Sequence, residues 1–320
     1  MRHVFIRNPG AGGSRRYRDF FEELQQAAQE LQISYEIYET RAPGDGRIYI
    51  NRICRETAVR GERLRIYGCG GDGTLHELVN GAYGFDHVEI GMIPLGTGND
   101  YIRNYGTAAD FLNAGRQLAG VSQSSDLIHY RAEYRGAVTE GYCANMFNIG
   151  FDCNVVDMTD RVKRLPLIGG SLAYLISVCV ILIKKKGANL RIEFADGSVK
   201  DGPVLLSAIA NGCFCGGGVK GVPESILDDG LMDVSIVNDI SRLLFLRLFP
   251  SYAAGTHLRK KHLVERGIIR YSKERSLVIT ANGEHLRLCT DGEITTQKRI
   301  EFKVVKHAFR FIVPADPARV

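Results

Sequence analysis

The sequence predicts two domains: an α/β domain built on a parallel sheet, followed by a mainly β, sandwich-like domain. Strands and helices alternate through the first third of the chain, which is typical of parallel sheets with right-handed crossovers. From about Leu127 onward, β-branched residues and alternating polar and apolar positions predominate. The length of 320 residues is enough for two hydrophobic cores of ordinary size.

The predicted first domain begins with a strand at Val4–Arg7 and a helix from about Arg15 to Leu31. Apolar residues recur in that helix at i, i+3 and i+4, the spacing of one helical face. The elements that follow are a strand at 34–39, a helix at 45–59, a strand at 64–68, a helix from Thr74, a strand at 88–93 and a helix at 108–118. In such a sheet the carboxyl ends of the strands share one edge, where ligands bind.

The predicted second domain opens with a hairpin of two strands, 128–134 and 138–143, around Arg135-Gly136. Further strands are expected at 190–194, 204–210, 232–237, 268–271, 277–281, 286–289 and 300–305, and helices at 155–164, 171–183 and 241–256. The helix at 171–183 closes the longest uncharged stretch, 165–183. It would be roughly 20 Å long, too short for ~30 Å of bilayer hydrocarbon. A buried core helix and the lining of an acyl-chain channel both fit it.

The most informative segment is Gly70–Gly81, GGDGTLHELVNG, which follows an apolar strand and opens an amphipathic helix. Glycines let backbone N–H groups approach an anion closely, and the positive end of the helix dipole faces the same place. Asp72 lies inside this turn. Because a carboxylate repels phosphate oxygens unless a divalent cation separates them, Asp72 indicates Mg²⁺ and a polyphosphate such as ATP. The segment therefore predicts phosphoryl transfer.

Two other interpretations of this segment stay open. Thr74 and Glu77 fit the capping-box pattern Thr-x-x-Glu, which would give both a structural role at a helix N-terminus. The run Gly68–Gly73 matches the dinucleotide-binding pattern G-x-G-x-x-G. The acidic residue that would bind a ribose is absent, since the next strand ends in Pro94-Leu95-Gly96, so hydride transfer is disfavoured.

Three predicted strands end in glycine-containing loops, at 8–13, 68–73 and 94–100. Loops at one edge of a parallel sheet can meet on a single ligand. The third loop, PLGTGND, could by itself be only a turn in which Asn99 or Asp100 caps a short helix. None of the loops is a Walker A sequence, so a nucleotide would be held mainly by backbone N–H groups and a metal ion.

Two acidic turns in the second domain each have a structural and a functional interpretation. Thr290–Glu293 contains Asp-Gly, a strong hairpin signal, yet Glu293 at its edge could accept the proton of an attacking alcohol. Leu227–Leu231, LDDGL, could be a plain turn or an oxygen-rich metal site in which Asp229 is joined by backbone carbonyls.

Composition and charge favour a globular protein that stays in the cytoplasm. The chain starts with a strand-like segment and no long apolar leader, and its eight cysteines include no Cys-x-x-Cys pair, which favours reduced thiols over a zinc site. The formal charge of +5 is modest, and we expect no nucleic-acid partner. Lys184–Lys186 and Arg259–Lys261 form basic clusters that are either solvated surface or attract anionic lipid headgroups.

Six motifs occur in the order seen in the diacylglycerol kinase catalytic-domain family, which the chain resembles over nearly its whole length. That family includes soluble bacterial diacylglycerol kinases, related lipid kinases and sphingosine kinases. The motifs are NPGAG at 8–12, GGDGT at 70–74, PLGTGND at 94–100, Asn211-Gly212 with GGG at 216–218, DDG at 228–230 and DGE at 291–293.

The resemblance implies a two-domain kinase whose first domain is similar to NAD kinases and phosphofructokinases. That domain would span 1–125 and be completed by 306–320, with the lipid-substrate domain at 126–305. MgATP would lie in the interdomain cleft and give its γ-phosphoryl group to a lipid hydroxyl, in the first place that of diacylglycerol. Transient contact with the anionic inner face of the membrane is expected, and a homodimer is one assembly to consider.

By motif matching, the resemblance implies one catalytic base and two groups of ligand contacts. Glu293 would be the general base, and Asp72 and Asp100 would organise Mg²⁺ and water. The residues that would contact ATP are Asn8, Pro9, Gly10, Ala11, Gly12, Thr40, Gly71, Asp72, Gly73, Thr74, Leu75, His76, Glu77 and Thr97.

The resemblance also implies a structural Mg²⁺ held by Asp229 with the carbonyls of Ile226 and Leu231. One departure is His76, which stands where the family pattern has asparagine and receives no catalytic role. Two alternatives are a kinase of a soluble acceptor, similar to NAD kinases, and a nonenzymatic ATP- or lipid-binding protein. The loop at 94–100 and the DGE motif favour a lipid acceptor, and the retained acidic residues favour turnover.

Overall fold

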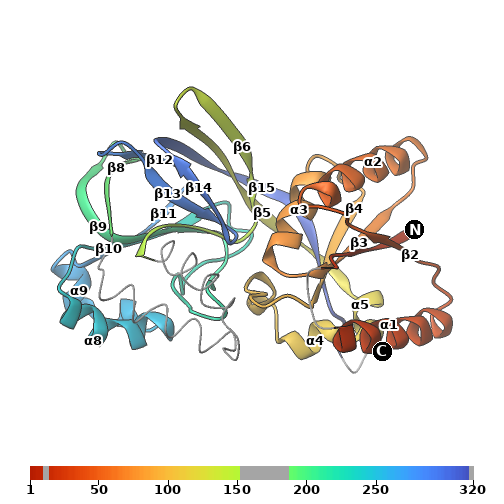
Figure 1. The fold of residues 1–320 in the computed structure, drawn as a ribbon. Coiled ribbons are helices and arrows are strands. Elements are labelled where there is room, and N and C mark those ends of the chain that lie inside the picture. Colours follow the sequence, from red (N-terminus) through yellow and green to blue (C-terminus); the bar gives the residue numbers. More distant parts are fainter. Residues whose placement is uncertain (10–13, 152–186, 317–320) are drawn as a thin grey trace. The chain divides into compact units, whose positions relative to one another are not determined.

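The computed structural model describes residues 1–9, 14–151 and 187–316. The chain separates into two compact units, residues 1–126 with 307–320 (unit 1) and residues 127–306 (unit 2). Two long strands, β5 (Val121–Tyr134) and β15 (Arg299–Val313), each run from one unit into the other, so the chain crosses the boundary twice (Figure 1).

Unit 1 is an α/β domain with a parallel sheet, as the sequence predicts. Its elements are β1 (Arg2–Arg7), α1 (Ser14–Glu30), β2 (Glu36–Glu39), α2 (Asp45–Val59), β3 (Leu64–Gly70), α3 (Asp72–Ala82), β4 (Val88–Pro94), the 3-10 helix η1 (Tyr101–Asn104), α4 (Ala108–Leu112) and α5 (Ala114–Leu118). The strand order is β15-β4-β3-β1-β2, with every pair parallel. This order places β1, β3 and β4, whose loops carry the glycine motifs, side by side.

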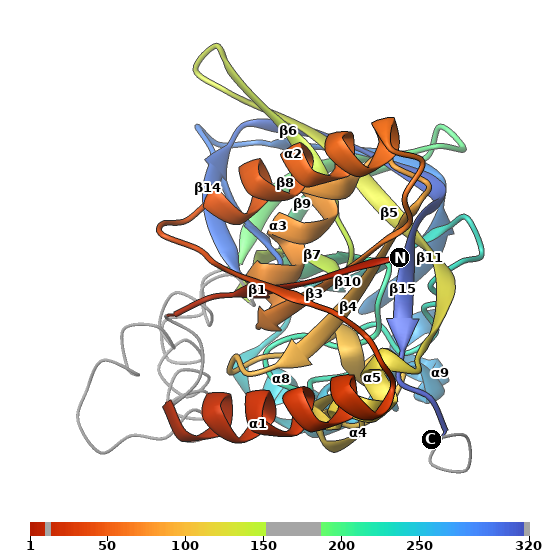
Figure 2. The ribbon, with the colours of Figure 1, turned by 90° about the vertical axis from the view of Figure 1, so that its right-hand side faces the viewer.

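Helices cover both faces of the unit 1 sheet. Helices α2 and α3 lie on one face, and α1, α4 and α5 lie on the other (Figure 2). On the second face Leu24 of α1 and Leu118 of α5 pack with Phe5 and Tyr67 of the sheet. Every residue of β4 is buried, as expected for a strand covered on both sides.

Unit 2 is mainly β and is built largely from antiparallel strand pairs. Besides β5 and β15 its elements are β6 (Ala137–Cys143), β7 (Met146–Gly150), β8 (Ala188–Phe194), β9 (Val199–Ala210), β10 (Met232–Asn238), α8 (Arg242–Ala253), the 3-10 helix η2 (His257–Arg259), α9 (Lys261–Glu265), β11 (Ile269–Glu274), β12 (Ser276–Ala281), β13 (Leu286–Thr290) and β14 (Glu293–Gln297).

The long strand β9 divides the unit 2 sheet. Its residues 199–204 pair with β8 and its residues 206–210 pair with β7, while its other edge pairs with β10. The strands close around one apolar core that includes Phe147, Ile192, Ile236, Ile279 and Phe302. A second cluster joins α8 and α9 to β9, β10 and β11. The expected sandwich-like, mainly β domain is confirmed.

Several element boundaries differ from the sequence prediction. The predicted helix at 108–118 is two short helices, because Asn113 has extended backbone angles and its side chain caps the second helix by accepting from the Arg116 N–H. Strands β7 and β14 were not predicted. The central Asn148 interrupts the apolar run of β7, and β14 is largely polar and exposed. The helices expected at 155–164 and 171–183 lie outside the described residues.

Over the part of the chain that the structure describes, no helix is long and apolar enough to cross a membrane.

Two buried histidines make the fold sensitive to acid. His257 is fully buried and His3 is 5 % exposed, and burial lowers the pKa of each to about 4. An unfolded histidine titrates near pH 6.5. Between these values the unfolded chain binds protons that the folded chain does not, so the free energy of unfolding decreases as pH falls through this window.

We expect His257→Gln to remove about half of this acid sensitivity. Wild type should lose about 2 kcal/mol per buried histidine between pH 6.5 and about 4.5, as follows from 1.36 kcal/mol per pH unit. Urea unfolding measured at several pH values tests this, with the exposed His262→Gln as control. If the free energy of unfolding fell equally steeply with pH in His257→Gln and in wild type, His257 would not be a source of the acid sensitivity.

Candidate functional site

The three glycine loops begin side by side at the carboxyl edge of the unit 1 sheet. The Asn8 N–H donates to the Cys69 carbonyl at 3.3 Å, which joins the first loop to the second. The Gly96 N–H donates to the Gly70 carbonyl at 3.0 Å, which joins the third loop to the second. The Thr40 N–H donates to the Arg7 carbonyl at 2.9 Å, so the residue after β2 lies at the same edge.

The second and third loops touch backbone to backbone, and glycine makes this contact possible. A Cβ atom at Gly96 would lie 2.5 Å from the Gly71 Cα, and one at Gly70 would lie 2.0 Å from the Thr74 Oγ1. Gly73 differs, because a Cβ there would meet no atom of the described residues within 4 Å. Gly96 is therefore needed for the two loops to pack, and Gly70 makes room for the Thr74 side chain, while no described residue fills the space beside Gly73.

The Asp72 carboxylate fastens the third loop to the second. Asp72 is the first residue of α3, and its Oδ1 accepts from the Asp100 N–H at 2.9 Å and from the Tyr101 N–H at 3.2 Å. It thereby binds the first amides of η1 while lying at the N-terminus of α3. Both helix ends favour negative charge.

Asp100 lies directly beside Asp72 and is 5 % exposed. Its carboxylate is 3.4 Å from the Arg103 Nε. The structure thus brings together Asp72 and Asp100, the two residues to which the family resemblance assigns Mg²⁺ and water. No group of three or more His, Cys, Asp or Glu side chains arranged to hold a metal occurs among the described residues. The pair fits Mg²⁺ of the kind that takes most of its ligands from phosphate and water.

Asn99 is a polar residue of this junction that sequence reasoning treated only as a turn former. Its φ is 52°, in the left-handed region, and its Nδ2 donates to the Gly96 carbonyl at 2.7 Å. The Asn99 Oδ1 is buried and has no hydrogen-bond partner within the described part of the chain. A buried acceptor of this kind normally finds a partner in water or a ligand. The signal in the sequence is asparagine at the left-handed position of a glycine turn.

Glu77 belongs to α3 but caps the N-terminus of α2. Its Oε1 accepts from the Gly44 N–H at 2.9 Å and its Oε2 accepts from the Arg47 N–H at 3.3 Å, both at the start of α2. Helix α3 has Gly71 as its N-cap and no side-chain cap, and Thr74 already lies within its first turn. The capping-box interpretation of Thr74 and Glu77 is therefore wrong, because the helix begins two residues earlier than predicted.

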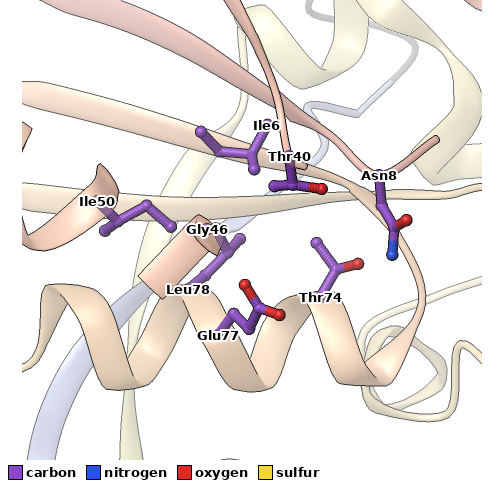
Figure 3. Close-up of a pocket in the computed structure, with 8 residues that line it drawn as sticks. All are labelled: Ile6, Asn8, Thr40, Gly46, Ile50, Thr74, Glu77 and Leu78. Atoms are coloured by element: carbon purple, nitrogen blue, oxygen red, sulfur yellow. The ribbon is translucent and has the colours of Figure 1, made fainter. Parts of the chain in front are cut away.

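Four of the residues predicted to contact ATP line one small pocket. Figure 3 shows Thr74 and Glu77 on the same side of α3, facing the strand ends that carry Asn8 and Thr40. Its volume is about 10 Å³, which is room for about one water molecule. A nucleotide would therefore lie over the loops rather than inside this pocket. The lining residues are Ile6, Asn8, Thr40, Gly46, Ile50, Thr74, Glu77 and Leu78.

The other predicted ATP contacts are placed differently. Leu75 is buried in the core, so only its backbone can meet a ligand, whereas Pro9 and Thr97 are exposed. His76 is half-buried, and its carbonyl accepts from the Asn80 side chain at 2.8 Å. Gly10, Ala11 and Gly12 lie outside the described residues.

In unit 2 Glu293 is the exposed first residue of β14. The preceding Asp291 and Gly292 have φ values of 46° and 98°, and the predicted Asp-Gly hairpin is confirmed. The Asp291 Oδ1 accepts from the Met146 N–H at 3.2 Å, which fixes the turn to the start of β7. The turn thus holds Glu293 at a fixed place with its carboxylate in solvent.

At the expected structural metal site, a lysine engages Asp229. The Lys273 Nζ lies 3.0 Å from the Asp229 Oδ2, 3.0 Å from the Asp233 Oδ2 and 3.1 Å from the Glu224 carbonyl. The Asp229 Oδ1 accepts from the Leu231 N–H at 3.0 Å. A divalent cation on Asp229 would have to displace the ammonium group. As arranged, these residues do not fit a structural Mg²⁺.

Comparison with known proteins identifies the family. Residues 2–130 match the diacylglycerol kinase catalytic domain, and residues 145–313 match the YegS C-terminal NAD kinase beta sandwich-like domain. The chain belongs to the diacylglycerol kinase and YegS-like kinase family. The resemblance drawn from the six motifs is confirmed, and so is the prediction of a kinase.

Relatives of this kinase match over almost their whole length. It is 27 % identical to a diacylglycerol kinase of Bacillus subtilis, over 98 % of this chain and 96 % of that protein. It is 29 % identical to a probable lipid kinase YegS-like of Xanthomonas oryzae pv. oryzae, over 92 % of each. A crystal structure of a putative diacylglycerol kinase from Bacillus anthracis has the same fold, with a TM-score of 0.68 and 22 % identity over 100 % of this chain and 98 % of that one.

We expect Gly96→Ala to destabilise this kinase by about 2 kcal/mol or more, since overpacking of rigid backbone has costs of this size. The matched change Gly73→Ala should leave stability unchanged or raise it, because alanine is the better helix former and its Cβ meets open space. Urea unfolding of both variants makes the comparison. Equal stability of the two would show that the loops do not pack as described.

We expect Lys273→Met to lower the free energy of unfolding by about 2–3 kcal/mol, because it leaves the buried Asp233 without its cation. Adding Mg²⁺ should restore part of this loss in the variant, while the melting temperature of wild type should not respond to Mg²⁺ or EDTA. The exposed Lys303→Met is the control. A fall in wild-type melting temperature on chelation would instead support a resident metal at Asp229.

Proposed function

We propose that this chain is an ATP-dependent lipid kinase that transfers the γ-phosphoryl group of ATP to a lipid hydroxyl, in the first place that of diacylglycerol. The observation that carries the proposal is the junction of three loops at the carboxyl edge of the unit 1 sheet, where Asp72 and Asp100 lie together at the start of α3. The relatives named above, a diacylglycerol kinase and a probable lipid kinase, support the acceptor class.

The loops would bind the phosphates of ATP. The open space above Gly73 allows phosphate oxygens to approach the first turn of α3, where backbone N–H groups and the helix dipole attract anions. The exposed Thr97 and the neighbouring Asn8 and Thr40 would contact the rest of the nucleotide. Asp72 and Asp100 would hold Mg²⁺, which neutralises charge on the phosphate oxygens when bound.

Glu293 would act as the general base. An exposed carboxylate can accept the proton of the lipid hydroxyl as the hydroxyl oxygen bonds to the γ-phosphorus and the bond to ADP breaks. Arg103, beside Asp100, is a candidate for stabilising the transferring phosphoryl group. The proposal requires that Glu293 reach the phosphate bound by unit 1 during turnover.

Such an enzyme would work in the cytoplasm and contact the anionic inner face of the membrane, where its lipid substrate is found. A homodimer stays a hypothesis. Two alternatives are a kinase of a soluble acceptor and a nonenzymatic ATP- or lipid-binding protein. The two alternatives differ in which acceptor supports the formation of ADP from ATP. A soluble-acceptor kinase would form ADP with a soluble alcohol, and a binding protein would form no ADP with any acceptor.

We expect Glu293→Gln to lower lipid-dependent ADP formation by about a hundredfold or more, because a positioned base contributes on this scale, while ATP binding persists. Asp72→Asn should lower both ADP formation and Mg²⁺-dependent ATP binding. The assay is ADP release from MgATP with a panel of lipids, including diacylglycerol, in mixed micelles. The exposed Glu284→Gln, in the loop that joins β12 to β13, should retain full activity.

Each other outcome points to a different function. ADP formation with a soluble alcohol and with no lipid would replace the lipid kinase by a soluble-acceptor kinase. If the protein binds ATP but forms no ADP with any acceptor, it would be a nonenzymatic ATP- or lipid-binding protein. Full activity of Glu293→Gln would remove this residue from the mechanism but not the lipid acceptor.

A further inference from the structure

Helix α8 buries one side and exposes a second apolar side. Phe245, Leu248 and Tyr252 are buried in the cluster that joins the helix to the unit 2 strands. Leu243 and Leu246, one helical turn apart, are 60 % and 54 % exposed. The helix is fixed independently of this exposed side, because its buried side is packed and the Ser241 Oγ caps it by accepting from the Leu244 N–H at 3.2 Å. The two exposed leucines form a small apolar patch on one face of the helix, and such patches often mark an interaction site.

The same region carries most of the net positive charge of the chain. Residues 239–266 contain six Lys or Arg and two acidic residues, a net of +4, against +5 for all 320 residues. Arg242 and Arg247 flank the two leucines, and Arg259–Lys261 lie where η2, which contacts both helices, leads into α9. None of the six basic side chains forms an ion pair with a described carboxylate. Among the described residues no ion pair neutralises their charge, which suits an anionic partner.

We propose that this α8–α9 surface, defined as Arg242, Leu243, Leu246, Arg247, Arg259–Lys261 and Val264, docks on an anionic lipid bilayer. Val264 of α9 adds a further exposed apolar side chain, at 40 %. Helices of this kind lie in the membrane interface, with apolar side chains inserted and basic side chains at the headgroups. The inference rests on the proposed function, since an enzyme that takes its substrate from a bilayer must bind its surface.

Charge complementarity selects the bilayer over other partners. A nucleic acid would use the basic side chains but would leave Leu243 and Leu246 in solvent. An anionic membrane satisfies both kinds of side chain at once. It also accounts for the position of these two leucines beside Arg242 and Arg247.

The first test is co-sedimentation of the full chain with vesicles of phosphatidylglycerol in phosphatidylcholine. We expect wild type to bind these vesicles, to bind pure phosphatidylcholine vesicles much less, and to lose binding as salt is raised. Leu243→Ser with Leu246→Ser, and separately Arg259→Gln with Lys260→Gln and Lys261→Gln, should each lower binding about tenfold or more. The matched control is Leu31→Ser with Ile48→Ser, which removes two exposed apolar side chains from unit 1.

The second test separates docking from catalysis. Activity is measured on long-chain diacylglycerol in anionic vesicles and on a short-chain diacylglycerol dissolved below its micelle concentration. The surface variants should lose activity on vesicles by a factor similar to their loss of binding. They should keep wild-type activity on the dissolved substrate, because none of the changed residues lies in the proposed nucleotide site or beside Glu293.

The outcomes distinguish the two proposals. If both surface variants bind anionic vesicles as wild type does, or if wild type binds neutral vesicles equally well, the docking surface is wrong while lipid phosphorylation can stand. If wild type binds anionic vesicles through this surface but phosphorylates neither form of diacylglycerol, the docking surface stands and diacylglycerol as acceptor fails.

Discussion

The contact between the second and third glycine loops is the constraint on which the unit 1 site depends. The Gly96 N–H bonds to the Gly70 carbonyl, and a Cβ at Gly96 would come within 2.5 Å of the Gly71 Cα. This close approach brings the Asp100 and Tyr101 amides within reach of the Asp72 carboxylate. One aspartate therefore closes the junction and places negative charge beside Asp100. Its substitution should affect stability as well as catalysis, so Asn, which keeps an acceptor oxygen, is a better probe than Ala.

Long-range carboxylate contacts also set the neighbouring parts of unit 1. Glu77 reaches from α3 to the first amides of α2 and so fixes the distance between the two helices on this face of the sheet. Gly46 of α2 and Glu77 of α3 both line the small pocket under Asn8 and Thr40, so the pocket lies beside this cap. The pocket has room for about one water molecule, so a whole nucleotide does not fit inside it. The loops above it are the surface left for the phosphates.

Local patterns in the sequence predicted the parallel sheet, the order of its helices and the position of the loops, because each depends on residues near one another in the chain. Asp45–Val59 is a helix with the predicted bounds, and the Asp-Gly turn before Glu293 forms the expected hairpin. What could not be predicted depends on contacts between distant residues. The partner of Glu77 lies 30 or more residues away, and that of Asp229 lies 44 residues away. No spacing rule finds such pairs, and a family motif points to a metal where this chain has Lys273.

The distribution of charge connects the two proposals physically. With +4 of the net charge of +5 in residues 239–266, the remaining 292 residues are close to neutral. Because the net charge is concentrated there, electrostatic steering would favour approaches to the bilayer in which α8 and α9 face the headgroups. Orientation would then be set before any lipid is bound. A fixed orientation would help a kinase that takes its substrate from the bilayer. In every encounter the same part of unit 2 would face the headgroups.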